Sequence, residues 1–141
     1  MAFNSLSSPA NAYAQVGIES SVHGSDPHHL ILLLFRGAES GVALAKECLR
    51  QNNIDGKNKA IRQAIQIINE GLSTSLDREA GGNLVEKLSA LYDYMCLRLL
   101  RANLKNDIEA LDEVATLLAE IRSGWEEISP TSAPTGAKVA A

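Results

Sequence analysis

Apolar residues recur at intervals of three and four along most of the chain. From residue 26 to residue 128 this interval, which is the period of an amphipathic helix, is maintained, and no stretch shows the alternation typical of a strand. Proline, which interrupts helices, is absent between positions 28 and 129. The pattern therefore predicts an all-α protein built from long helices.

The first two helices are bounded by recognisable start and stop signals. Asp26-Pro27 predicts the start of the first helix, because aspartate accepts backbone N–H bonds as an N-cap and proline at the next position loses no helical bond. This helix is expected to end near Gln51. The second is expected to run to Leu76 and to stop in the turn 77–82, which contains two glycines. Their core-facing positions are Leu30, Ile31, Leu34, Ala38, Val42, Ala45 and Leu49, followed by Ile61, Ala64, Ile65, Ile68, Leu72 and Leu76.

The third and fourth helices follow after that turn. Asn83, with Glu86 three residues later, predicts a capping box at the start of the third helix. Asn106, with Glu109 at the third helical position, is predicted to cap the fourth. Their apolar stripes are Leu84, Leu88, Leu91, Tyr92, Met95, Leu99 and Ala102, and then Ile108, Leu111, Val114, Ala115, Leu118, Ile121, Trp125 and Ile128.

Four such helices joined by short turns predict an antiparallel up-down four-helix bundle over residues 26–129. An N-terminal arm, residues 1–25, precedes it. The tail at 130–141 is rich in small residues and proline and is predicted to be disordered. The arm nevertheless carries Tyr13, Val16 and Ile18, which are unusual in a segment that only solubilises a protein.

Composition narrows the classes of partner. The net charge of −4 and the scattered Lys and Arg residues argue against a nucleic-acid partner. The longest apolar run, LILLLF at 30–35, is far shorter than the roughly 20 residues that span a bilayer, so no membrane insertion is expected. The two cysteines have no metal-binding spacing, and the N-terminus shows no signal-peptide pattern; both observations indicate a cytoplasmic protein.

The sequence shows no arrangement of residues that predicts catalysis. His23, His28 and His29 lack the three- or four-residue spacing of a helical metal site, and the Glu-x-x-His signature of di-iron bundles does not occur. These histidines are interpreted as solvated or capping residues. No phosphate-binding loop and no nucleophile motif is found. We therefore expect neither an enzyme nor a bound cofactor or metal.

Apolar residues exceed what a bundle core requires, since a core-facing stripe takes about three residues in seven. Residues beyond the stripes are Ile67, Tyr94, Cys96, Leu97, Leu100 and Leu117. In one interpretation the core is wide or the N-terminal arm covers the surplus. In the other, the surplus forms a groove for a partner helix. The two are compatible, because an arm can cover a groove until a partner arrives.

Several motifs in order resemble the flagellar secretion chaperone (FliS) family. They are AYAQV at 12–16, SDPHHLILLLFRGA at 25–38, AIQIINEGL at 64–72, LDREAGGNL at 76–84, LYDYM at 91–95, RLLRANLKND at 98–107 and EVATLLAEIRSGWEEI at 113–128. The combination of LYDYM, ANLKND and the glycine turn before them is specific, and the resemblance spans about residues 10 to 130.

This resemblance implies a cytoplasmic export chaperone that binds the C-terminal helical segment of flagellin and prevents its premature polymerisation. It also implies delivery of flagellin to the export gate through the cytoplasmic domain of FlhA. An alternative that shares the bundle is a regulatory adaptor that binds another flagellar protein, such as the anti-sigma factor FlgM.

The resemblance also implies roles for individual residues. The flagellin-binding groove is expected to be lined or supported by Ile65, Ile68, Leu72, Leu91, Tyr94 and Met95. Tyr92 is assigned to the core, and Asn103 and Asp107 to the turn between the third and fourth helices. In the arm, Tyr13, Val16 and Ile18 are expected to cover the groove or to contact the export gate.

Overall fold

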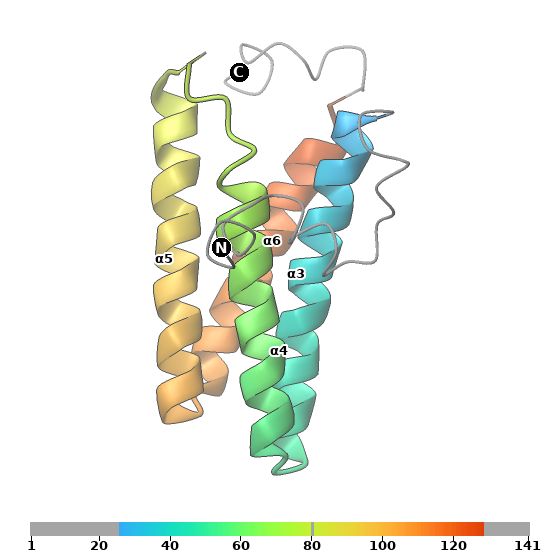
Figure 1. The fold of residues 1–141 in the computed structure, drawn as a ribbon, viewed down its shortest axis with the longest axis vertical. Coiled ribbons are helices and arrows are strands. Elements are labelled where there is room, and N and C mark those ends of the chain that lie inside the picture. The colour runs from blue at the N-terminus through green and yellow to red at the C-terminus, as the bar shows by residue number, and fades with distance from the viewer. Residues whose placement is uncertain (1–25, 80, 129–141) are drawn as a thin grey trace, which may run out of the picture.

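The structure is a computed structural model that describes residues 26–79 and 81–128. Within these ranges the chain forms the helices α3 (Pro27–Arg50), α4 (Ile54–Gln66), α5 (Asn83–Lys105) and α6 (Ile108–Glu126), with a π-helix, η2 (Ile67–Leu72), continuing α4, and no strand. Successive helices run in opposite directions (Figure 1). The predicted antiparallel four-helix bundle is confirmed for this part of the chain. The arm at 1–25 and the tail at 130–141 lie outside the described residues.

The helices pack as the corners of a square. Helix α3 packs against α4 and α6, and α5 packs against the same two helices from the opposite corner. The core between them includes Tyr92, as predicted. Its largest fully buried apolar side chains are Phe35, Leu34, Ile61, Ile68, Leu72, Met95, Leu99, Leu111, Leu118, Val42 and Val114.

The first residues of α3 and α5 agree with the sequence prediction, but the N-caps of α5 and α6 do not. The side chain of Asp26 accepts the backbone N–H of His29 at 3.2 Å, as an N-cap should. The N-cap of α5 is Gly82, with φ of 93° and no side-chain cap, so the capping box predicted at Asn83 is wrong. Only glycine adopts this backbone conformation without strain, so Gly82 takes the N-cap position and Asn83 is the first helical residue.

Two adjacent residues have different roles in the turn between α5 and α6. Asn106, predicted to cap α6, instead ends α5 in the left-handed conformation with φ of 52°. Asp107 caps α6, since its Oδ1 accepts the N–H of Ala110 at 3.2 Å. That bond, assisted by Arg101 and Arg98, lowers the pKa of Asp107 against the effect of desolvation. The structural role expected for Asp107 is therefore present, whereas the cap assigned to Asn106 is wrong.

His28 joins the start of α3 to the end of α6. Its ring is buried and stacks on the indole of Trp125, with ring centroids 4.9 Å apart. The Nε2 atom of His28 lies 2.8 Å from the backbone oxygen of Trp125, and the indole N–H donates to the backbone oxygen of His28 at 3.0 Å. The prediction of a solvated or capping histidine is wrong here, because the aromatic partner is 97 residues away in the sequence.

The second helix does not remain regular as far as predicted. Ordinary α-helical bonding ends at Gln66, and the six residues of η2 take its place before the turn. In η2 the N–H of Ser73 bonds to the oxygen of Ile68, five residues earlier, at 2.8 Å. The periodicity of the apolar residues is compatible with both registers, so the sequence pattern did not distinguish them.

Candidate functional site

The outer face of α5 exposes large apolar side chains in helical register. Tyr94, Leu97, Leu100 and Leu104 are separated by three, three and four residues, and their exposed fractions are 40%, 65%, 48% and 81%. Residues at this spacing lie on one side of a helix. We call these four residues the α5 face. Contiguous exposed apolar surface of this kind is a mark of an interaction site.

A polar network at the edge of the α5 face ties it to α6. The hydroxyl of Tyr94 donates to Glu113 at 2.6 Å, and the Nε of Arg98 donates to the other carboxylate oxygen at 2.7 Å. The bond from Tyr94, followed by that from Arg98, lowers the pKa of Glu113 in spite of partial desolvation. The same contact raises the pKa of Tyr94. The carboxylate therefore holds the tyrosine ring in a defined position on the exposed surface.

Lys57 of α4 anchors the C-terminal end of α5. Its buried ammonium donates to the backbone oxygen of Asn103 and to Oδ1 of Asn106, both at 2.8 Å. Burial lowers the pKa of Lys57, because desolvation disfavours the charged form. These bonds satisfy oxygens at the end of α5, where the last carbonyl groups of a helix have no N–H donor within the helix. The last turn, which carries Leu104, is thus held by a residue from another helix.

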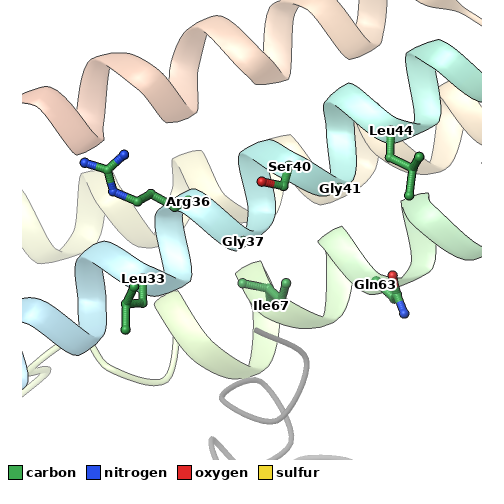
Figure 2. Close-up of a pocket in the computed structure, with 8 residues that line it drawn as sticks. All are labelled: Leu33, Arg36, Gly37, Ser40, Gly41, Leu44, Gln63 and Ile67. Carbon is green, nitrogen blue, oxygen red and sulfur yellow. The ribbon is translucent and has the colours of Figure 1, made fainter. Parts of the chain in front are cut away.

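A second surface lies between α3 and α4. It is a pocket of about 380 Å³ lined by Leu33, Arg36, Gly37, Ser40, Gly41, Leu44, Gln63 and Ile67. Figure 2 shows Leu33 and Leu44 toward its two ends and Ile67 between them. A Cβ atom on Gly41 would lie only 3.2 Å from Cβ of Ala64, so this glycine permits the close approach of the two helices. We call this pocket the α3–α4 groove.

The six residues expected to line or support the groove differ in how far they are buried. Ile68, Leu72 and Met95 are fully or almost fully buried in the core. Ile65 and Leu91 are partly buried and pack against that core. Only Tyr94 is exposed. The structure therefore places three of the six side chains in the core, leaves two partly buried at its margin and exposes one. Tyr13, Val16 and Ile18 lie outside the described residues.

The groove predicted from the sequence does not include three residues of the α5 face. The sequence prediction counts Leu97 and Leu100 as surplus to the core without placing them in the groove, and it does not include Leu104. A helical repeat that starts at Tyr94 and continues through these leucines would have identified them. The α3–α4 groove has no such signal, because its shape depends on the contact between two helices.

Nothing in the described ranges resembles a metal centre or a membrane anchor. Across residues 26–79 and 81–128, no three His, Cys, Asp or Glu side chains are grouped so that they could hold a metal ion. No helix in these ranges is both long and apolar enough to cross a bilayer. Cys48 is buried, and desolvation together with Asp93 raises the pKa of Cys96 to about 11, which makes it a poor nucleophile at neutral pH.

The bundle and its exposed helix face define a helical protein of the kind that binds another protein. Comparison with known families gives the particular one: residues 9–132 match the family model described as flagellar protein FliS. The chain belongs to the FliS family.

Individual relatives support this assignment. The chain is 49% identical over 119 residues to the flagellar secretion chaperone FliS of Salmonella typhimurium, covering 84% of this chain and 88% of the relative. It is 43% identical over 122 residues to that of Escherichia coli, with 85% and 90% covered. It is also 33% identical over 122 residues to that of Bacillus subtilis, with 86% of each chain covered.

Proposed function

We propose that this chain is an export chaperone that binds the C-terminal helical segment of flagellin, prevents its premature polymerisation and delivers it to the export gate through the cytoplasmic domain of FlhA. Membership of the FliS family supports the chaperone role, since its relatives are named flagellar secretion chaperones. The observation that carries the proposal is the exposed apolar α5 face. No catalytic step and no cofactor is assigned to the chain.

The α5 face suits a partner that folds as it binds. A disordered segment loses conformational entropy when it becomes helical, and a long apolar contact is needed to offset that loss. Leu97, Leu100 and Leu104 repeat at the three- and four-residue intervals that an amphipathic helix also uses for its anchors. A flagellin segment held in this way cannot use the same apolar side for packing in a filament.

The residues expected from the sequence take different parts in this proposal. Tyr94 contacts the flagellin segment directly, and its orientation is kept by Glu113. Leu91 is partly buried beside the face. Met95 is buried in the core and supports α5 from within. In this proposal the bound flagellin segment continues from α5 toward Ile65 of α4 and toward the π-helix η2, which contains Ile68 and Leu72.

The arm residues complete the proposed cycle. Tyr13, Val16 and Ile18 cover the groove when flagellin is absent, and flagellin binding releases them so that Tyr13 contacts FlhA. The variant Tyr13→Ala is expected to keep its affinity for flagellin, while the loaded complex loses affinity for the FlhA domain. Unchanged affinity for FlhA would restrict Tyr13 to packing.

Titration calorimetry and gel filtration with a fragment containing the flagellin C-terminal segment test the central step. We expect a 1:1 complex. Leu104→Asp should weaken it at least about tenfold, because it places a charge where an apolar anchor binds. Thr116→Asp, at an exposed position of α6, is the matched control and should bind normally. Absence of complex with the wild-type chain would refute the proposal, and a normal Leu104→Asp complex would remove the α5 face from it.

A further inference from the structure

The exposed side of α5 continues the spacing of its leucines toward the N-terminus of the helix. Counted back from Leu104 in alternating steps of four and three residues, the positions are Leu100, Leu97, Asp93 and Ala90, and all five are exposed. This alternation is that of the a and d positions of a coiled coil, along which one helix packs against another. The five residues, which we call the α5 seam, therefore have the arrangement of one half of a helix pair.

Asp93 is the one charged residue in the α5 seam. It lies one helical turn before Leu97 and on the same side of the helix. A helix that packs along the three leucines therefore reaches the Asp93 carboxylate with its next turn. Water is removed from a carboxylate that is covered in this way, and the loss is costly unless a positive charge takes the place of the water.

The carboxylate of Asp93 has no cationic neighbour on its own helix. The side chains three and four positions away are those that can pair with it along α5, and they are Ser89, Ala90, Cys96 and Leu97. Within the described part of the chain, the carboxylate makes no hydrogen bond or ion pair. Burial, followed by the charge of Asp93, raises the pKa of Cys96. This is the effect expected of a negative charge that is not neutralised.

The arginines beside the α5 seam are already paired with other residues. Arg98 bonds to Glu113 at 2.7 Å, and Arg101 bonds to Asp107 at 3.3 Å. Asp93 is in the middle of α5, so the positive end of the helix macrodipole, which acts within the first turn, does not stabilise its charge. The negative charge of Asp93 therefore remains available to a molecule that binds along the seam.

We propose that Asp93 selects a Lys or Arg residue in the flagellin segment that packs along the α5 seam. This role rests on the proposed function and specifies the chemistry of the partner. The bound helix has an apolar stripe that contacts Leu97, Leu100 and Leu104, and the next position of that stripe is basic. A helix with an apolar or acidic residue there leaves the carboxylate covered without a positive charge and binds less well. Asp93 thus fixes the register of the segment along α5.

Replacing Asp93 by leucine separates this role from that of a surface charge that only keeps the chain soluble. Asp93→Leu extends the leucines of the seam, so a partner with an apolar residue at this point would bind more tightly. A partner with a basic residue there should bind at least about fivefold more weakly, because its charge loses its counterpart. Glu120→Leu, which removes an exposed acid from α6, is the matched control and should bind like the wild type.

Titration calorimetry with the flagellin C-terminal fragment measures these affinities, and circular dichroism establishes that both variants are folded. A folded Asp93→Leu variant that binds as well as the Glu120→Leu control, or more tightly, overturns the role of Asp93. Absence of a complex with the wild-type chain refutes the proposed function itself.

A double-mutant cycle identifies the basic residue of the segment. Each Lys and Arg of the fragment is changed in turn to Gln, and each fragment is titrated against the wild-type chain and against Asp93→Asn. One basic residue should be coupled to Asp93 by at least about fivefold in affinity. Its place before or after the apolar anchors of the fragment gives the direction of the bound helix on α5. A complete set of fragments without a coupled residue overturns the proposal.

Discussion

Helices α3 and α5 are nearly equal in length, 24 and 23 residues, but they use their apolar residues differently. Helix α3 buries eight residues along its whole length, among them Leu34 and Phe35. Helix α5 buries only four, Tyr92, Met95, Leu99 and Ala102, while the α5 face remains exposed. The buried apolar side chains of α3 stabilise the bundle, whereas the four residues of the α5 face are available for another molecule.

The contacts of the two helices explain this difference. Helix α3 is joined to α6 by ion pairs, Arg122 with Glu39 at 2.6 Å and Arg36 with Glu126 at 2.7 Å, in addition to the His28–Trp125 pair. Gly41 allows α4 to approach it closely. Helix α5 is tied to its neighbours by polar contacts that include the Tyr94–Glu113–Arg98 network and the Lys57 anchor. The Tyr94 network and the Lys57 anchor lie beside the exposed leucines and keep the α5 face in place.

Truncating one large side chain on each helix is the strongest test of the difference between α3 and α5. Phe35→Ala should reduce the free energy of unfolding by about 3–5 kcal/mol, because it leaves a cavity at a fully buried position. Leu104→Ala should change it by less than about 0.5 kcal/mol, since that side chain is largely exposed. Urea unfolding followed by circular dichroism measures both. Equal losses would show that α5 contributes to stability as α3 does.

The Lys57 anchor is expected to have the next largest effect. Lys57→Ala leaves the backbone oxygen of Asn103 and Oδ1 of Asn106 without their donor, which should cost about 1–3 kcal/mol of unfolding free energy. Lys59→Ala, at an exposed position of the same helix, is the control. In hydrogen exchange the loss should concentrate in the last turn of α5. A Lys57→Ala variant as stable as the control would show that α5 is held by other contacts.

The smallest effect concerns the network beside Tyr94 and depends on pH. The pKa of Glu113 is lowered in the folded chain, so its contribution to stability is present above its ordinary pKa of 4.5 and is lost as the pH falls toward the folded value. Glu113→Gln should therefore show a weaker decline of stability below about pH 4.5 than the wild type. Thermal unfolding at a series of pH values measures this. Parallel curves for the two proteins would remove Glu113 from the acid response.

Much of the fold follows from local signals. The periodicity of apolar residues and the absence of proline predicted four helices, and Asp26-Pro27 predicted the start of α3. The predicted caps at Asn83 and Asn106 were wrong because a neighbouring residue takes the N-cap position in each case: Gly82 with a positive φ before α5, and Asp107, whose carboxylate accepts a backbone N–H, before α6. Helix existence was therefore more predictable than helix ends, where one residue competes with the next.

The residues of the candidate site were harder to predict from the sequence than the helices were. The apolar pattern separated Leu99, which is in the core, from Leu100, which is exposed, but it did not show which of the surplus residues lie together on one surface. Tyr94 was recognised as surplus to the core from the apolar pattern, its assignment to the groove came from the family resemblance, and its role in binding remains a prediction. Lys57 was not singled out, because a buried lysine is recognised only by the oxygens that surround it.

The sequence by itself determined the helical period, the approximate lengths of the helices and the surplus of apolar residues over what a core needs, since these depend on neighbours along the chain. The tertiary structure decided where that surplus lies. It placed Leu97, Leu100 and Leu104 on the outside, enclosed Ile68 and Leu72, and left the end of α4 in a π register. These outcomes depend on which helices are adjacent, and that adjacency exists only when all four pack together.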